Sequence, residues 1–233
     1  MRAGINRTAR IDYGPAPFGS APMIDGTELA ALASAKICHD IMGPISVLVQ
    51  AIDTLKANDS AGRNAEEIAV LDEGLHKMWA KLDFFRFAFA GATAEGEGQL
   101  EEARDTAEKM FAHLKPSLVW SAANAPMPKA AVRVVANVLL VASDCLPRGG
   151  TVELVSDTQE VRVVATGDRA KLKPDVAAAL RGERPEMGFM GASIPPLLTG
   201  VAARANGVEI EPREGDGRVE FAIRTASHKA RAA

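Results

Sequence analysis

The sequence predicts an α+β protein in which an N-terminal antiparallel helical hairpin is followed by an α/β sandwich. Two observations support this prediction. Up to residue 91, apolar residues recur at steps of three and four, which is the period of an amphipathic helix. Beyond that point, short apolar or alternating segments of strand length are mixed with helical segments and glycine-rich turns. We therefore expect a flexible leader at 1–26, a hairpin at 27–91, a second domain at 92–226 and a tail at 227–233.

The first expected helix begins near Thr27 and continues for about 30 residues, because one stripe along it is apolar. The stripe consists of Leu29, Leu32, Ile37, Ile41, Ile45, Leu48, Ile52 and Leu55. Polar residues and a glycine between 58 and 62 are typical of a turn, so the chain is expected to reverse its direction there.

The second expected helix has a more regular pattern, a heptad seam in which the steps alternate between three and four. The seam consists of Ile68, Leu71, Leu75, Met78, Leu82, Phe85 and Phe89. Gly91 is expected to end this helix. A single hairpin cannot cover its own apolar stripe on all sides. We therefore expect two copies to form a homodimer with a four-helix bundle.

The most informative stretch begins at Cys38 and reads Cys-His-Asp-Ile-Met-Gly-Pro. The imidazole of His39 can carry a phosphoryl group on one ring nitrogen. The carboxylate of Asp40 can bind the other ring nitrogen and so keep the reacting lone pair free. Pro44 removes a backbone donor and crowds the carbonyl one turn earlier, which loosens the helix beside the histidine.

The position of His39 on its helix predicts that it faces solvent. It lies two residues from both Ile37 and Ile41, which belong to the apolar stripe. At about 100° per residue, the histidine points about 200° away from each of them. An outward histidine is what a phosphoryl carrier requires.

The second domain is expected to contain strands with helices on one face. The expected helices are 100–114, 129–145, 174–180 and 194–205, and the expected strands are 117–121, 151–155, 161–165, 208–211 and 218–224. The last two strands are expected to form a hairpin across Gly215-Asp216-Gly217.

The composition excludes several classes of function. The chain has 27 Lys and Arg residues against 30 Asp and Glu residues, a net charge of −3, so a nucleic-acid partner is not expected. No continuous apolar run is long enough to span a bilayer, so a membrane partner is not expected either. Two cysteines are too few for a disulfide framework, which favours the reducing cytoplasm.

A hairpin that bears His-Asp-x-x-x-Pro before such a second domain resembles the dimerisation and ATP-binding domains of sensor histidine kinases. In those kinases an asparagine holds Mg²⁺ at the position that is Val141 here. An aspartate that binds adenine matches Ala165, and a glycine of the same motif matches Arg169. The glycine-rich phosphate loop matches 187–191, where two glycines remain at the wrong spacing. The resemblance therefore implies a second domain that has lost its nucleotide site.

An intact histidine helix with a lost nucleotide site is similar to the ChpT-type histidine phosphotransferases of alphaproteobacteria. The segments 85–91, 113–120 and 170–174 add to this resemblance. It implies a homodimer that accepts a phosphoryl group from the receiver domain of a hybrid histidine kinase and passes it to response regulators. It also implies no cofactor or metal on this chain, with Mg²⁺ held by the partner receiver domain.

The expected site has His39 as phosphoacceptor and Asp40 as the group that orients and supports it. Lys36, one turn earlier, is expected to help neutralise the phosphoryl group. The residues expected to contact a partner are Lys36, Ile41, Met42, Ile45, Lys81, Phe84 and Arg86.

Two alternative functions remain open from the sequence. One is an active sensor-type histidine kinase with an unusual nucleotide site, which requires binding of ATP and metal. The other is a non-catalytic dimeric scaffold that binds response regulators and never carries phosphate.

Overall fold

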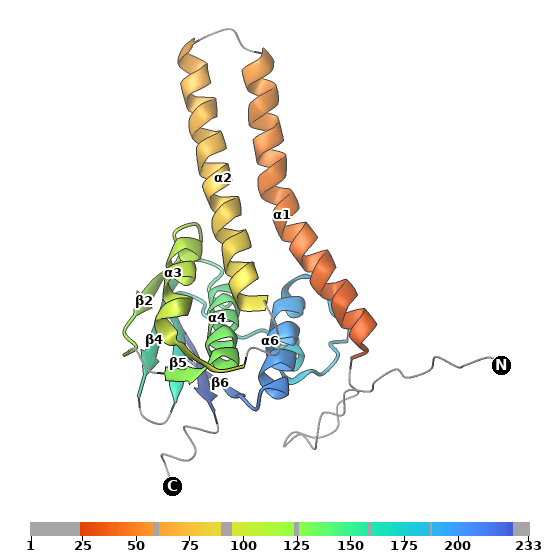
Figure 1. Ribbon diagram of the computed structural model, residues 1–233, viewed down its shortest axis with the longest axis vertical. Coiled ribbons are helices and arrows are strands. Elements are labelled where there is room, and N and C mark those ends of the chain that lie inside the picture. The colour runs from red at the N-terminus through yellow and green to blue at the C-terminus, as the bar shows by residue number, and fades with distance from the viewer. Residues whose placement is uncertain are drawn as a thin grey trace, which may run out of the picture.

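A computed structural model gives the fold of this chain (Figure 1). The residues that it describes are 24–57, 61–89, 95–123, 126–157, 160–186 and 188–225, with only the backbone described for 61–64. Several expected features lie outside the described residues, namely the leader up to residue 23, the turn at 58–60, the helix end at Gly91 and the tail at 227–233.

Two long helices, α1 (Gly26–Ala57) and α2 (Ala61–Phe89), form the expected hairpin and project from the rest of the molecule (Figure 1). Gly62, expected in the turn, belongs to α2. The helices approach closely at Gly74, where a Cβ atom would lie 2.9 Å from Leu48 Cδ2. A larger residue at Gly74 would therefore require the Leu48 side chain to move.

The second domain contains a five-stranded sheet of order β2-β4-β5-β7-β6. Its strands are β2 (Pro116–Trp120), β4 (Gly150–Ser156), β5 (Val161–Thr166), β6 (Glu209–Gly215) and β7 (Arg218–Arg224). The strand β2 runs parallel to β4, and the other neighbours are antiparallel. All five strands were expected from the sequence.

Helices cover one face of this sheet (Figure 1). They are α3 (Leu100–Phe111), α4 (Lys129–Asp144) and α6 (Ile194–Ala205), and α5 (Pro174–Arg181) packs against α6. The central helix α4 is buried on almost all sides, which explains why its sequence is apolar nearly throughout. The α+β architecture predicted from the sequence is therefore confirmed.

Three short elements were not expected. The strands β1 (Glu97–Gln99) and β3 (Pro126–Pro128) form a small antiparallel pair, and η1 (Gly191–Ser193) is one turn of 3₁₀ helix. Each has only three residues, which is too short for a periodic pattern.

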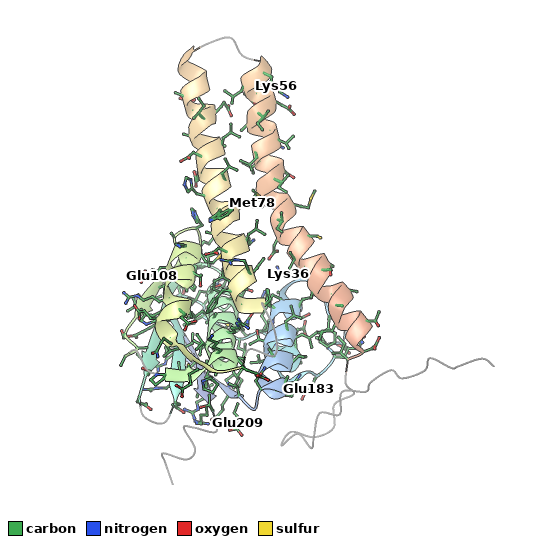
Figure 2. All side chains as sticks on the ribbon, viewed as in Figure 1. Lys36, Lys56, Met78, Glu108, Glu183 and Glu209 are labelled. Atoms are coloured by element: carbon green, nitrogen blue, oxygen red, sulfur yellow. The ribbon has the colours of Figure 1, made fainter. Side chains whose placement is uncertain are left out.

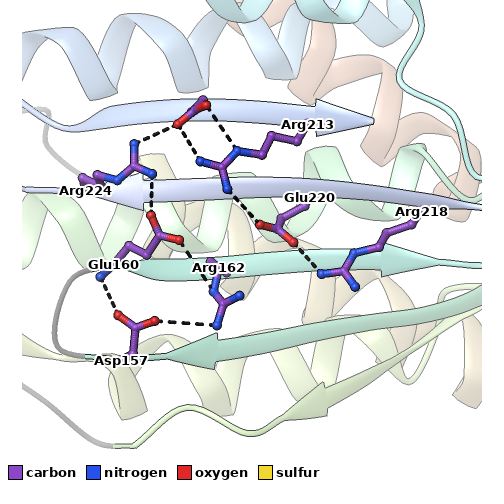
Figure 3. A network of polar contacts seen from close by, with 8 residues as sticks. Asp157, Glu160, Arg162, Arg213, Arg218, Glu220 and Arg224 are labelled. Atoms are coloured by element: carbon purple, nitrogen blue, oxygen red, sulfur yellow. Dashed lines mark hydrogen bonds and ion pairs between the residues drawn. The ribbon is translucent and has the colours of Figure 1, made fainter. Parts of the chain in front are cut away.

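The other face of the sheet is covered by charged side chains rather than by helices. Carboxylates and guanidinium groups alternate across β5, β7 and β6 and the turn before β5 (Figure 3). The network consists of Asp157, Glu160, Arg162, Glu211, Arg213, Arg218, Glu220 and Arg224. Arg224, on β7, binds Glu211 on β6 and Glu160 just before β5, with Nη2 2.6 Å from Glu160 Oε2 and Nη1 2.8 Å from Glu211 Oε2. Hydrogen bonds from Arg213 and Arg224 lower the pKa of Glu211. This face is therefore suited to solvent and needs no further layer of structure.

The end of α2 is built into the core of the second domain. Phe84, Phe85 and Ala88 belong to the same buried cluster as α3, α4 and the sheet. The amide Nδ2 of Asn137, on α4, donates to the carbonyl oxygens of Ala88 and Arg133, each at 2.9 Å. The hairpin and the second domain consequently share one continuous core.

One expected partner contact is wrong for this reason. Phe84 was expected on the exposed side of α2, but its side chain is 0% exposed. The heptad pattern assigns a residue to a face of its helix, and it does not show that a second domain covers that face near the helix end. Phe84 therefore stabilises the junction between the domains.

The beginning of α1 is held against the second domain by a separate set of contacts. Leu29 and Leu32 pack with Phe189 and Leu197 in a small apolar cluster. The guanidinium of Arg184 lies 2.6 and 2.7 Å from the two carboxylate oxygens of Glu28 and 5.3 Å from the centre of the Phe189 ring. Both helices of the hairpin are thus anchored at their lower ends.

Asn137→Ala should lower the free energy of unfolding by about 1–3 kcal/mol, because it leaves the buried carbonyl of Ala88 without this donor. Chemical denaturation measures the change. Asn206→Ala is the matched control, since the Asn206 amide donates to Ala202 within one turn of a partly exposed helix end. A loss at Asn137 no larger than that at Asn206 would contradict the proposed importance of the junction.

Candidate functional site

The site is built around His39, which lies on the exposed side of α1. Its side chain is 83% exposed, which confirms the outward orientation predicted from the spacing of the apolar stripe. Ring nitrogen Nδ1 lies 3.2 Å from Asp40 Oδ1. An ionised carboxylate can only accept hydrogen bonds, so Nδ1 must carry the proton in this contact. The lone pair of neutral His39 is then on Nε2.

The carboxylate of Asp40 connects several charged groups. Only 11% of its side chain is exposed, and Oδ1 accepts from Lys36 Nζ at 2.7 Å. Burial acts to raise the pKa of Asp40. Hydrogen bonds from Lys36 and His39, together with the charges of Lys36 and Lys81, outweigh burial, so the pKa of Asp40 is lowered overall. Asp40 therefore remains an acceptor for His39 at neutral pH.

Lys81 reaches the same carboxylate from the other helix of the hairpin. Its Nζ lies 3.8 Å from Asp40 Oδ2 and donates to the main-chain oxygen of Asp40 at 3.4 Å. Burial, together with the charges of Lys36 and Lys77, lowers the pKa of Lys81, while the charges of Asp40 and Asp144 oppose this shift. Lys81 was expected to be an exposed partner contact, but only 25% of its side chain is exposed and its ammonium faces Asp40.

Asp144, at the end of α4, extends the charged cluster into the second domain. Asp144 is exposed, but neighbouring protein atoms reduce the hydration of its carboxylate and the charge of Asp40 acts in the same direction, so the pKa of Asp144 is raised. Lys36, Lys173 and Lys81 act in the opposite direction. Lys36 lies on the side of α1 that faces α2 (Figure 2). Sequence reasoning missed Asp144, because nothing in its local pattern reveals that α4 ends near the hairpin.

The remaining expected contact residues differ in their exposure. Met42 is 58% exposed, whereas Ile41 and Ile45 are half-buried. The guanidinium of Arg86 is exposed and lies 2.6 Å from Asp83 Oδ1. Met42 and Arg86 therefore provide exposed apolar and charged groups on the same hairpin as His39. Phe84, which is buried, does not belong to this surface.

The positions that resemble the ATP-binding elements of kinases have other roles here. Asn137 binds two carbonyl groups, and Val141 and Ala165 are fully buried in the core. Arg169 has a positive φ of 60°. An open hollow lies nearby, lined by 167–171 and 214–217, with both acidic and basic residues on its rim. Within the described residues, no group of three His, Cys, Asp or Glu side chains is placed to hold a metal ion.

Comparisons with known proteins agree with this description. A family model for the histidine phosphotransferase C-terminal domain matches residues 100–218, from the start of α3 to the first residue of β7. The protein phosphotransferase ChpT of Brucella abortus (strain 2308) is 28% identical over 192 residues, covering 80% of this chain and 90% of that protein. An alignment of this length extends from the second domain into the hairpin.

A solved structure described as a bacterial phosphotransferase matches with a TM-score of 0.76 at 26% identity. The match covers 88% of this chain and 100% of that one. The arrangement of hairpin and second domain is therefore shared with a protein of known structure.

Asp40→Asn should destabilise the protein by about 1–2 kcal/mol at pH 7, because a partly buried carboxylate is removed from two ammonium groups. The difference from the wild type should shrink as the pH falls. A carboxyl group whose pKa is lowered by folding stabilises the protein above its ordinary pKa of 3.8, and this stabilisation is lost as the pH falls through the lower folded value. Urea denaturation between pH 2.5 and 7 measures the difference.

The matched control for this measurement is Asp72→Asn. The Asp72 carboxylate is 71% exposed on α2 and lies 3.4 Å from His76 Nδ1, so its replacement should change the stability by less than about 0.5 kcal/mol. If the stability difference between Asp40→Asn and the wild type did not change with pH, the ionised carboxylate of Asp40 would not be what stabilises the contacts with Lys36 and Lys81.

Proposed function

This chain belongs to the histidine phosphotransferase family, and from this premise we propose that His39 is its phosphoacceptor. The chain is a phosphotransferase of a phosphorelay, similar over most of its length to a protein phosphotransferase. The observation that supports the proposal is the exposed ring of His39, held through Nδ1 by the partly buried carboxylate of Asp40. Such a ring presents the nucleophilic nitrogen Nε2 to a partner.

Transfer to His39 needs no ATP, because the donor is an aspartyl phosphate on a receiver domain. The lone pair of Nε2 forms a bond to phosphorus as the bond from phosphorus to the aspartyl oxygen breaks, and the donor aspartate leaves as a carboxylate. The proton on Nδ1 stays in its hydrogen bond to Asp40, which stabilises the positive charge on the ring. The same steps in reverse pass the phosphoryl group to the aspartate of a second receiver domain.

Mg²⁺ held by the receiver domain would neutralise charge on the phosphoryl oxygens. Lys36 is close enough to His39 to assist, since it already binds the neighbouring Asp40. No metal or cofactor on this chain is required for the transfer.

The partners are receiver domains of hybrid histidine kinases and of response regulators. Met42 offers an exposed apolar contact three residues from His39, and Arg86 offers an exposed charge on α2. Ile41 and Ile45 support this surface from half-buried positions. Transient interfaces of this kind often bury less than about 1,200 Å². A small surface beside His39 is therefore sufficient.

A second copy of the chain covers the upper hairpin. Large apolar side chains are exposed along both helices, and soluble proteins rarely leave many of them uncovered on one part of their surface. Apart from Met42 beside His39, the exposed residues are Val47, Val49, Ile52, Ile68, Val70, Leu75 and Trp79. Ile68 and Leu75 belong to the predicted heptad seam, which supports a dimeric four-helix bundle.

By length and mean hydropathy, α1 has the properties of a helix that could cross a membrane. Lys36, His39 and Asp40 lie within it, α1 packs beside α2 and α6, and a second copy covers its exposed apolar residues in the proposed dimer. We therefore assign the apolar character of α1 to contacts with protein and place the phosphotransferase in the cytoplasm.

The transfer step can be tested by mixing the protein with a receiver domain that carries labelled phosphate. The wild type should acquire acid-labile label. His39→Ala should lose the label by a factor of at least about 100, because the nucleophile is absent. His76→Ala is the matched control, since His76 is also exposed on the hairpin and its Nδ1 lies 3.4 Å from a carboxylate. Equal labelling of the His39 variant, or binding of the receiver without any label on the wild type, would contradict the proposal. The second result would favour a scaffold.

The dimer can be tested by sedimentation. The wild type should have twice the mass of one chain, and Leu75→Glu should give monomers, because it places a charge in the bundle. Val119→Glu is the matched control, since Val119 is also an exposed apolar residue but lies on β2 of the second domain. A monomeric wild type would contradict the proposed dimer.

A further inference from the structure

Pro44 leaves one main-chain acceptor of α1 without its usual partner. In an α-helix the N–H group of each residue donates to the carbonyl oxygen four positions earlier. Proline has no N–H group, so the carbonyl of Asp40 receives no such bond from position 44. This carbonyl belongs to the residue that also holds the ring of His39.

A side chain from α2 donates to the Asp40 carbonyl in place of the missing N–H group. Lys81 of α2 donates from Nζ to the carbonyl oxygen of Asp40 at 3.4 Å, across a separation of 41 residues in the sequence. The same Nζ lies 3.8 Å from Asp40 Oδ2. Lys81 thus contacts both the main chain and the carboxylate of Asp40, while Lys36 binds the opposite carboxylate oxygen at 2.7 Å.

We infer that Lys81 is a positioning residue for phosphotransfer, which replaces the hydrogen bond that Pro44 removes and thereby holds Asp40 against the ring of His39. The inference rests on the proposed role of His39 as phosphoacceptor. Lys81 does not touch the reacting nitrogen and acts through Asp40. Its contribution is to keep the proton on Nδ1 and the lone pair on Nε2.

The surroundings of Lys81 favour this role over binding of a partner. Its side chain is only one-quarter exposed, so the ammonium has limited access to a receiver domain. The charged groups around it are Lys36 and Asp40 on α1, Lys77 on α2 and Asp144 on α4. Lys77 lies one turn from Lys81 on the same helix, is exposed and does not contact Asp40 among the described residues. The chain therefore contains its own matched control.

The test measures the tautomer of the neutral His39 ring by ¹⁵N NMR and the rate of phosphoryl acceptance from a labelled receiver domain. Lys81→Met should increase the fraction of the ring protonated on Nε2 and slow acceptance about tenfold, since a hydrogen bond to a charged group is lost. Lys81→Arg keeps the positive charge and the hydrogen-bond donors, so its tautomer fraction and its rate of phosphoryl acceptance should stay close to those of the wild type. Lys77→Met should match the wild type.

Combining Lys81→Met with Pro44→Ala separates the contact of Lys81 with the Asp40 carbonyl from its contact with the Asp40 carboxylate. Pro44→Ala restores an N–H group that can donate to the carbonyl of Asp40, and alanine is a good helix former. The loss caused by Lys81→Met should therefore be smaller in the Pro44→Ala protein than in the wild type, by both measurements.

Three results would overturn the inference. These are an unchanged tautomer and rate in Lys81→Met, an equal loss in Lys77→Met, and a loss from Lys81→Met that is the same with Pro44 and with Ala at that position. Failure of the proposed function has a different signature. The wild type would then accept no phosphate, and the tautomer measurement would still report whether Lys81 positions the ring.

Discussion

The partly buried carboxylate of Asp40 is the constraint on which the site depends. It must stay ionised to hold the Nδ1 proton of His39, although only 11% of its side chain is exposed. Burial alone would favour the neutral acid, which could no longer accept from the ring in the same way. Lys36 on the same helix and Lys81 on the opposite helix counteract this tendency. The state of one exposed imidazole therefore depends on how two helices pair at this level.

The second domain fixes the lower end of that helix pair. Phe84 and Phe85 extend its core into α2, and Asn137 binds the carbonyl of Ala88 at the end of the helix. Arg184 and Glu28 join the start of α1 to the other side of the domain. A sensor kinase needs a second domain that delivers ATP to the histidine. Here Asn137 instead binds the end of α2, and Val141 and Ala165 are buried in the core, which suits a protein that receives its phosphoryl group from a partner.

Much of this arrangement could be predicted from the sequence, because it follows from local periodicity. The spacing of Ile37 and Ile41 placed His39 outward, and its side chain is 83% exposed. The major helices and strands of the second domain were also predictable.

Contacts between distant segments could not be predicted from the sequence. Phe84 was assigned to an exposed face because a heptad pattern cannot reveal a neighbouring domain. Lys81 was assigned to partner binding because its contact with Asp40 depends on the register of the hairpin. The adjacent pair Phe84-Phe85 was the available signal of a helix end buried on two sides.

The most direct test of the central claim is the position of the phosphoryl group on the labelled protein. Two-dimensional NMR that correlates the ring protons of His39 with ¹⁵N and ³¹P distinguishes the two ring nitrogens. The geometry predicts phosphorus bonded to Nε2, with the proton retained on Nδ1 beside Asp40. Phosphorus on Nδ1, or on a residue other than His39, would contradict the role assigned to Asp40 and the site built around it.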